Sequence, residues 1–322
     1  MRAKRSGEFS WIAKHFAPLS GLGADGLSDD AALVDLGRTI VTQDTIVESV
    51  HFLSDDTPFD VAMKAVGVNA SDIVAKGGTP VAMTVGLGVP DRWGDADVAA
   101  FAEGLAEYCD PTMALTNRVP QIALLGGDTT RSPERLFVSL AMFGRPGARY
   151  VSRSGARVGD LVVVCGPIGA AVLGLKGRLG ELADVPDDLL HAYAAPAPNF
   201  AAASAVANYA SAAMDVSDGL VGDLAKLCAA SGIGAAIDLA EMPIPASAKP
   251  FVDGDRNLLV EMATGGDDYV VLMTLAAKDR APLLAMEGVD ATVIGHVVRG
   301  EGVSVSLDGV PLEIERASYS HD

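Results

Sequence analysis

Four near-continuous apolar runs most constrain what this 322-residue chain can fold into. They cover residues 80–89, 122–125, 136–143 and 161–165. Their length suits β-strands, and strands without polar alternation are typical of sheets whose two faces are covered by helices or by a second subunit. The pattern therefore predicts a layered protein with buried sheets.

Helical segments alternate with these runs. The clearest has Thr57 as its N-cap and Pro58 at its first helical position, and it ends at Gly77. Helical spacing puts Asn69 and Asp72 on one polar stripe, so the Asp72 side chain is expected to point to the same side of the helix as Asn69. Further helices are predicted at 95–108, 168–178, 200–209, 220–230 and 278–286, and later strands at 235–239, 269–275, 292–298 and 303–307. The chain is thus predicted to be an α/β or α+β protein.

Length and composition predict two domains around large cores. Hydrophobic residues make up 49% of the chain, and 322 residues exceed the usual size of one domain. The turn-rich segment 144–147 lies between apolar runs, so we predict domains 1–147 and 148–322. Aspartate motifs occur in both halves, which predicts a site in the cleft between them.

The charge of the chain limits its partners. There are 24 basic and 42 acidic residues, which give a formal charge of -18. This excess repels nucleic acid and anionic membranes, and it disfavours anionic substrates unless metal ions intervene. We therefore expect neither a nucleic acid nor a membrane as a partner. A solubilising acidic surface accounts for most of the surplus.

The cysteines and the N-terminus predict a cytoplasmic protein. Cys109, Cys165 and Cys228 are far apart and form no CxxC pair, as in reduced proteins rather than in disulfide frameworks. The N-terminal residues contain no apolar signal core. The five histidines show no spacing typical of a zinc site.

Six short motifs built around aspartate suggest a metal-dependent phosphate site. They are Ser28-Asp29-Asp30, Thr42-Gln43-Asp44, Asn69-Ala70-Ser71-Asp72, Gly126-Gly127-Asp128-Thr129-Thr130, Asp215-Val216-Ser217-Asp218-Gly219 and Gly265-Gly266-Asp267-Asp268-Tyr269. Mg²⁺ prefers several oxygen ligands, and phosphoryl transfer uses such ions to neutralise crowded phosphates. Any one motif is more often an ordinary turn. Six of them in one chain favour the functional interpretation.

The usual nucleotide-binding loops are missing. Residues 21–26 spell GxGxxG, but no predicted strand precedes them, and there is no GxxxxGK[ST] sequence. Phosphates would then be held by metals, by arginine and by glycine turns such as 126–127 and 265–266. Arg153 is a candidate anion ligand on a loop of small residues. His51 and Tyr319 are weaker candidates, since either could simply pack against its neighbours.

Taken in order along the chain, these motifs resemble those of the thiamine-monophosphate kinases. The resemblance runs from Gly7 to Tyr269 and includes the six aspartate motifs, His51 and the loop at Arg153. It implies ATP-dependent phosphorylation of thiamine monophosphate to thiamine diphosphate. It also implies the two-domain aminoimidazole ribonucleotide synthetase-like fold, a homodimer formed through the N-terminal sheet, and a nucleotide site in the cleft between the domains.

The resemblance also implies roles for individual residues. Magnesium ligands fall on Asp30, Thr42, Gln43, Asp44, Asp72, Asp128, Asp215 and Asp218. The six aspartates of that set carry catalysis through the ions they hold. ATP contacts fall on Gly127, Asp128, Arg153 and Ser217, and substrate contacts on His51, Asp267 and Tyr319.

The chain departs from the family pattern at a few positions. Ser28 replaces a usual glycine, Gln43 replaces a small hydroxyl residue, and Asp267 replaces a glutamate that is one methylene longer. The Gln43 ligand is either lost or supplied by the backbone carbonyl. Residues 111–120 look like an insertion near an ATP contact of the family.

The expected mechanism is direct in-line transfer without a covalent intermediate, because the acceptor phosphate is already anionic near neutral pH. Two alternatives stay open. One is another ATP-dependent enzyme of the same fold, such as a small-molecule kinase or a cyclo-ligase. The other is a non-catalytic regulator that binds Mg²⁺ and nucleotide.

Overall fold

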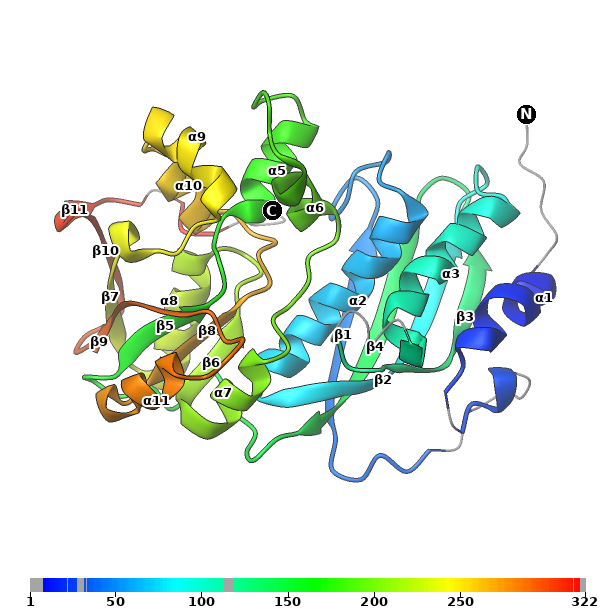
Figure 1. Ribbon diagram of the computed structural model, residues 1–322, viewed down its shortest axis with the longest axis horizontal. Coiled ribbons are helices and arrows are strands. Elements are labelled where there is room, and N and C mark those ends of the chain that lie inside the picture. Colours follow the sequence, from blue (N-terminus) through cyan, green and yellow to red (C-terminus); the bar gives the residue numbers. More distant parts are fainter. Residues whose placement is uncertain are drawn as a thin grey trace. The chain divides into compact units, whose positions relative to one another are not determined.

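The computed structural model describes residues 8–21, 23–27, 32, 34–112, 119–314 and 316–318. The chain divides into two compact units (Figure 1). Unit 1 comprises Met1–Ile73 and Thr79–Pro146, and unit 2 comprises Val74–Gly78 and Gly147–Asp322. The predicted site residues Asp30 and Tyr319 lie outside the described residues, as does Ser28.

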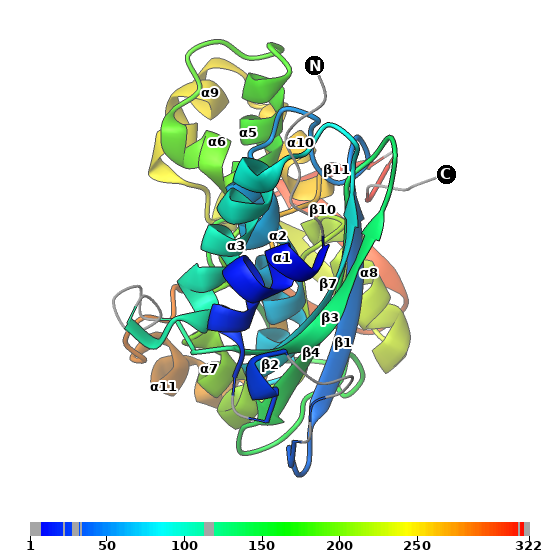
Figure 2. The same cartoon turned by 90° about the vertical axis from the view of Figure 1, so that its right-hand side faces the viewer.

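Unit 1 contains a four-stranded sheet with helices over one face. Its elements are α1 (Glu8–Trp11), η1 (Ile12–Phe16), η2 (Ala17–Leu19), η3 (Asp25–Leu27), β1 (Ile40–Val47), α2 (Pro58–Ala75), β2 (Gly78–Val89), α3 (Asp95–Cys109), β3 (Ala123–Arg131) and β4 (Phe137–Pro146). The strand order is β1-β4-β2-β3. β1 and β4 are antiparallel, and β2 and β3 are parallel. Figure 2 shows α2 and α3 together on one side of this sheet.

Helix α2 begins and ends where the sequence predicts. The hydroxyl of Thr57 accepts a hydrogen bond from the backbone N–H of Asp60 at 3.1 Å and donates one to the Asp60 carboxylate at 2.7 Å. This N-cap satisfies a donor of the first turn. The chain leaves the helix at Gly77, whose φ of 75° favours glycine. The predicted helix is confirmed.

Unit 2 contains a seven-stranded mixed sheet with a hydrophobic core on each face. Its strands are β5 (Leu161–Cys165), β6 (Ala210–Asp215), β7 (Gly234–Asp238), β8 (Val271–Leu275), β9 (Ala291–Val298), β10 (Gly302–Leu307) and β11 (Val310–Leu312), in the order β11-β10-β7-β9-β5-β8-β6. Its helices are α5 (Ala170–Arg178), α6 (Asp187–Ala194), α7 (Ala202–Tyr209), α8 (Leu220–Ser231), α9 (Lys249–Gly254), α10 (Leu258–Thr264) and α11 (Arg280–Leu284), with short turns η4 (Leu239–Glu241), η5 (Ala246–Ala248) and η6 (Ala277–Asp279).

The two cores use alternate side chains of the same strands. Val162 and Val164 of β5 pack with residues of α8 and α10, whereas Val163 and Cys165 pack with residues of α7. Both faces of β5 are therefore covered, as its unbroken apolar run predicts. Figure 1 shows α8 and α7 on opposite sides of this sheet.

The glycine pair at 126–127 corrects one expectation. We expected a glycine turn, but β3 continues through Gly126, Gly127 and Asp128 to Arg131. A Cβ on Gly127 would lie 2.0 Å from the carbonyl oxygen of Val85 on β2. Glycine is needed here because the paired strands approach closely.

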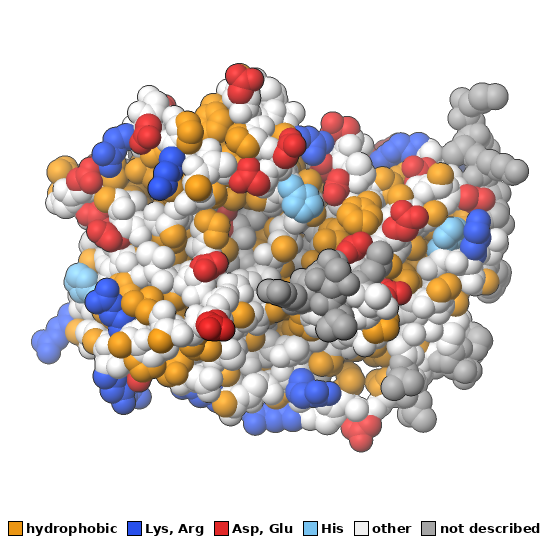
Figure 3. All heavy atoms as spheres, viewed as in Figure 1, with side chains coloured by type: hydrophobic (Ala, Val, Ile, Leu, Met, Phe, Trp, Pro, Cys, Tyr) orange, Lys and Arg blue, Asp and Glu red, His pale blue; other side chains and the backbone are white. Residues whose placement is uncertain are grey.

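The surface reflects the acidic composition of the chain, and the cysteines are part of its core. Figure 3 shows acidic side chains spread over one face among hydrophobic and uncharged ones. The three cysteines are free and buried. Within the described ranges, no helix combines the length and the apolarity that a membrane span requires.

Candidate functional site

Three predicted metal ligands come together between β1 and α2. Side chains of β1 alternate between half-buried and exposed, with Thr42 and Asp44 on the half-buried side. The Thr42 hydroxyl donates a hydrogen bond to Oδ2 of Asp72 at 2.5 Å. The backbone N–H of Asp44 donates to Oδ1 of Asn69 at 3.0 Å, and the Asn69 amide donates to the Ala65 carbonyl at 2.9 Å. One polar stripe of α2 therefore faces one side of β1.

The electrostatics of this group suit a cation. Burial, and then the charge of Asp72, raise the pKa of Asp44 to about 6. Two carboxylates in a half-buried position repel each other, and a bound cation would remove that repulsion. We call Thr42, Asp44 and Asp72 the acidic group of unit 1.

Gln43 lies on the other side of β1. Its side-chain amide donates to the hydroxyl of Ser139 on β4 at 3.0 Å, and the Thr45 hydroxyl donates to the same oxygen at 2.9 Å. The structure thus does not bring the Gln43 side chain to the acidic group. A ligand role for its backbone carbonyl stays a prediction.

Asp128 and Gly127 lie on β3, where Asp128 pairs with Gly86 of β2. The Asp128 side chain is exposed. Both residues line a pocket of about 910 Å³ in unit 1. Apolar residues such as Phe16 and Leu124 form much of its remaining wall. Among the described residues, no group of three or more Asp, Glu, His or Cys side chains could hold a metal ion.

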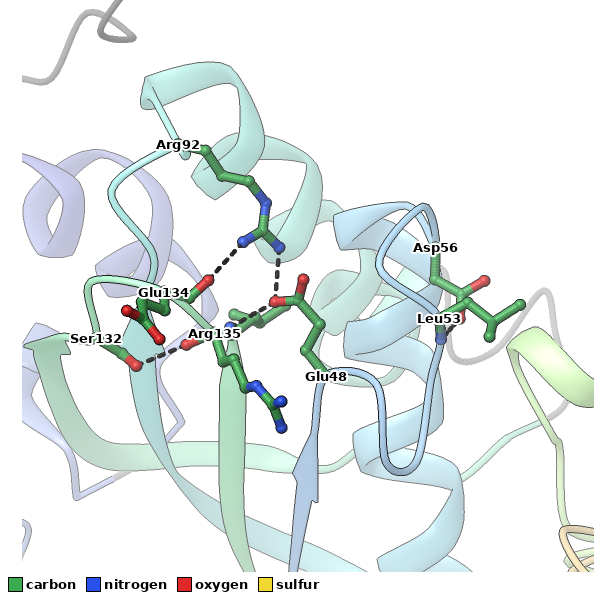
Figure 4. Close-up of polar contacts among 8 residues, drawn as sticks. Glu48, Leu53, Asp56, Arg92, Ser132, Glu134 and Arg135 are labelled. Carbon is green, nitrogen blue, oxygen red and sulfur yellow. Dashed lines mark hydrogen bonds and ion pairs between the residues drawn. The ribbon is translucent and has the colours of Figure 1, made fainter.

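The segment with His51 follows β1 and is held by a buried carboxylate. Nδ1 of His51 accepts a hydrogen bond from the backbone N–H of Val47 at 3.1 Å. Glu48 is buried, and its Oε2 accepts from the Leu136 N–H and from Nη2 of Arg92, both at 2.7 Å. Figure 4 shows Arg92 reaching both Glu48 and the carbonyl of Glu134. These contacts fix the end of β1 from which the His51 segment departs.

Sequence reasoning missed the Glu48–Arg92 pair. The two residues are 44 positions apart and belong to no recognisable motif. The one hint is that Glu48 directly follows the apolar end of β1, because a carboxylate buried there needs a partner.

In unit 2, the predicted Asp215–Asp218 motif forms the loop between β6 and α8. Asp215 is buried at the end of β6. Asp223, fully buried in the first turn of α8, accepts hydrogen bonds from the N–H groups of Ser217 at 3.0 Å and Asp218 at 2.9 Å. The Lys226 ammonium pairs with Asp223 at 2.7 Å and also with Asp218. Burial raises the pKa of Asp223, although Lys226 opposes the shift. Asp223 therefore shapes the loop that carries Ser217 and Asp218.

The structure joins this loop to residues 265–269, here called the substrate motif because they contain the predicted substrate contact Asp267. The N–H of Asp267 donates to the Ser217 carbonyl at 2.8 Å, and the N–H of Tyr269 donates to the Val216 carbonyl at 2.8 Å. In return, the Val216 N–H donates to the carbonyl of Val270 at 2.9 Å. Two motifs that are separate in sequence thus share one backbone network within unit 2.

The Asp268 side chain connects the substrate motif to the start of helix α5. Its Oδ1 accepts a hydrogen bond from the Gly169 N–H at 2.8 Å, at the start of α5. Its Oδ2 is buried and has no hydrogen-bond partner among the residues that the structure describes. Burial raises the pKa of this carboxyl well above its usual value. The resemblance assigns the substrate contact to Asp267, and the anchoring role of the neighbouring Asp268 was not predicted.

Arg153 lies on an exposed loop tied to the end of α8. The Ser231 hydroxyl donates to the Arg153 carbonyl and accepts from the N–H groups of Gly155 and Ala156, each at 3.2 Å. The loop backbone is therefore held while the arginine side chain extends into solvent, a suitable arrangement for an anion ligand.

Comparison with known proteins agrees with this architecture. Residues 28–145 match the N-terminal domain of AIR synthase related proteins, and residues 157–308 match the C-terminal domain. Thiamine-monophosphate kinase of Escherichia coli (strain K12) is 35% identical to this chain over an alignment that covers 98% of each. The Caulobacter vibrioides enzyme of that name is 33% identical over 98% of this chain and 90% of its own.

Solved structures give the same result. Thiamine-monophosphate kinase from Stenotrophomonas maltophilia K279a superposes with a TM-score of 0.78 at 30% identity, over 89% of this chain and 91% of that one. AaThiL complexed with AMPPCP and TMP superposes with a TM-score of 0.77 at 30% identity, over 100% and 99%. The predicted family and two-domain fold are confirmed. The chain belongs to the thiamine-monophosphate kinase family.

Proposed function

We propose that this chain transfers the γ-phosphoryl group of ATP to thiamine monophosphate, which yields thiamine diphosphate and ADP. The full-length identity to thiamine-monophosphate kinases supports the substrate pair, as does the likeness to AaThiL complexed with AMPPCP and TMP. The observation that carries the chemistry is the acidic group of unit 1, where two half-buried carboxylates and a hydroxyl lie together.

The donors of that group fit Mg²⁺. This ion prefers oxygen ligands and commonly uses one or two carboxylates, with waters and substrate phosphates completing its shell. Asp44, Asp72 and the Thr42 hydroxyl would hold it in unit 1. The remaining proposed ligands are Asp30, Asp128, Asp215, Asp218 and the Gln43 carbonyl. Several bound Mg²⁺ ions would neutralise phosphate charge during transfer.

The acidic residues explain why cations are required. Two unit charges ~4 Å apart interact by about 1 kcal/mol in water and about 4 kcal/mol at an effective dielectric constant of 20. ATP and a phosphomonoester beside these carboxylates would therefore repel one another strongly. Cations held by the aspartates would offset this repulsion, so that two anionic substrates can bind close together.

The acceptor needs no obligatory general base. Its phosphate loses a second proton near pH ~6, so a terminal oxygen is already anionic at neutral pH. The proposed route is direct in-line attack by that oxygen. The nucleotide would be positioned by Gly127, Asp128, Arg153 and Ser217. Thiamine monophosphate would be positioned by His51, Asp267 and Tyr319.

In this proposal the chain acts in the cytoplasm as a homodimer. Figure 2 shows the helices of unit 1 on one face of its sheet. Thr42 of β1 faces helix α2, so by strand alternation Val41, which is 61% exposed, lies on the other face. A second subunit could cover this face and bury its apolar side chains. Domain 1–147 would supply dimerisation and most metal ligands, and domain 148–322 would supply Arg153 and the two loops of unit 2. The free cysteines agree with a reducing compartment.

The test is product analysis with purified protein. ATP and thiamine monophosphate are supplied with Mg²⁺ or with excess EDTA, and ADP and thiamine diphosphate are quantified. Equal amounts of both products, formed only with Mg²⁺, are expected. ADP formation with a different acceptor from a panel would indicate another kinase or a cyclo-ligase. Nucleotide binding without ADP formation from any acceptor would indicate a regulator.

A further inference from the structure

The carboxylate of Asp267 is held by a neighbouring phenol. The Tyr269 hydroxyl donates a hydrogen bond to Oδ1 of Asp267 at 3.0 Å. The two residues are separated by Asp268 alone. A hydrogen bond to a charged acceptor is stronger than one between neutral groups, so it restricts how the short aspartate side chain can turn.

The backbone brings these side chains together by an uncommon conformation. Asp267 has φ of 69° and Tyr269 has φ of 50°, both in the left-handed region that favours glycine. A bulky aromatic residue is rarely found there. Such conformations persist where surrounding contacts enforce them, and they concentrate at functional sites.

The surrounding contacts are present on two sides. The N–H groups of Asp267 and Tyr269 donate to the carbonyls of Ser217 and Val216, and the Asp268 carboxylate accepts from Gly169 at the start of α5. A Cβ on Gly266 would lie 2.3 Å from the Ser217 carbonyl, so the loops are in close contact. The backbone that carries Asp267 and Tyr269 is therefore held by hydrogen bonds to the loop after β6 and to the start of α5.

We propose that Tyr269 is a positioning residue, which holds the Asp267 carboxylate in the orientation that recognises the acceptor. The inference rests on the proposed function. A carboxylate repels the acceptor phosphate, so Asp267 is suited to the positively charged thiazolium or to the amino group of thiamine. Aspartate is one methylene shorter than the glutamate expected at this position, and its fixed orientation keeps the charge where the acceptor needs it.

The first experiment compares Tyr269→Phe with wild type. This change removes one hydroxyl and retains the ring. The KM for thiamine monophosphate should rise about 10- to 150-fold, as expected for the loss of a hydrogen bond to a charged group. The KM for ATP and the kcat should stay within about twofold. Tyr209→Phe, at the half-buried end of α7 in the same unit, is the matched control and should change none of these values.

A double variant tests whether Tyr269 acts through Asp267. Asp267→Ala should raise the acceptor KM, and adding Tyr269→Phe to it should have no further effect. Tyr269→Asn serves as a second variant if Tyr269→Phe misfolds, because asparagine adopts the left-handed conformation more readily and cannot reach as a phenol does. It should give the same selective rise in acceptor KM.

Three outcomes would overturn the inference. They are an unchanged acceptor KM in a folded Tyr269 variant, an equal rise in both KM values, and additive effects of Tyr269→Phe and Asp267→Ala. A wild-type protein that forms no thiamine diphosphate would instead refute the proposed function, so the two failures are distinguishable.

Discussion

The hydroxyl of Thr42 donates a hydrogen bond to the carboxylate of Asp72 across 2.5 Å and joins β1 to α2 over a separation of 30 residues. The bond orients the carboxylate and leaves Asp44 close enough for the charge of Asp72 to raise its pKa. Strand and helix therefore present their oxygens as one group, and the following variants test what that group does.

Thr42→Val should weaken Mg²⁺ binding by at least about 10- to 100-fold, because it removes a proposed ligand that also orients the Asp72 carboxylate. Valine has nearly the shape of threonine, so the strand should be kept. The measurement is the Mg²⁺ concentration that gives half-maximal activity, with thermal stabilisation by Mg²⁺ and nucleotide as a second readout. Thr45→Val is the matched control, since the Thr45 side chain lies on the other side of β1, against Ser139, and its loss should leave both values unchanged.

Asp44→Asn should stabilise the protein at pH 8 in EDTA. A carboxyl whose pKa rises on folding, here to about 6 from 3.8, opposes folding once it must ionise. The penalty is absent below pH ~4, grows through pH ~6 and then stays constant, at about 1 to 3 kcal/mol. Thermal melts between pH 4 and pH 8 measure it. A variant less stable than wild type at pH 8, or a difference that does not change with pH, would contradict this account.

Arg92→Ala should destabilise unit 1, because the buried Glu48 carboxylate would lose its cation. The expected cost is about 1 to 3 kcal/mol in the free energy of unfolding, measured by urea titration. Arg131→Ala is the control, since its pair with Asp91 is largely solvent-exposed and should contribute little. Equal effects of the two substitutions would show that Glu48 does not depend on Arg92.

Gly127→Ala should disrupt the pairing of β2 and β3, because its Cβ would lie 2.0 Å from the Val85 carbonyl oxygen. We expect a large loss of stability, about 2 kcal/mol or more, seen in thermal melts. At Gly126 a Cβ would meet nothing within 4 Å, so Gly126→Ala should fold normally. A stable Gly127→Ala protein would mean that the strands can separate at this point.

The sequence was most informative where local chemistry decides the structure. The N-cap at Thr57, the proline after it and the glycine at position 77 were sufficient to predict α2, and the apolar run at 161–165 predicted β5. β6 was missed because its residues, Ala-Ser-Ala-Ala-Met-Asp, lack the β-branched side chains that favour strands. Pairing with β8 and burial in the sheet override that weak propensity.

The candidate site was predictable as a set of motifs but not as a set of contacts. Asp72 was predicted to point in a defined direction, and the structure adds that Thr42 meets it. The supporting roles of Glu48, Asp223 and Asp268 were not predicted, because the partners of these carboxylates are backbone N–H groups and cations supplied by tertiary folding. Such partners leave no regular spacing in a sequence.

The most direct test of the central claim is the initial rate of thiamine diphosphate formation by Asp72→Asn at saturating ATP, thiamine monophosphate and Mg²⁺. The substitution removes one ligand charge and changes little volume. We predict a rate at least about 100-fold below wild type, with an unchanged circular dichroism spectrum. A folded Asp72→Asn protein that works at a near-normal rate would contradict the role of the acidic group in catalysis.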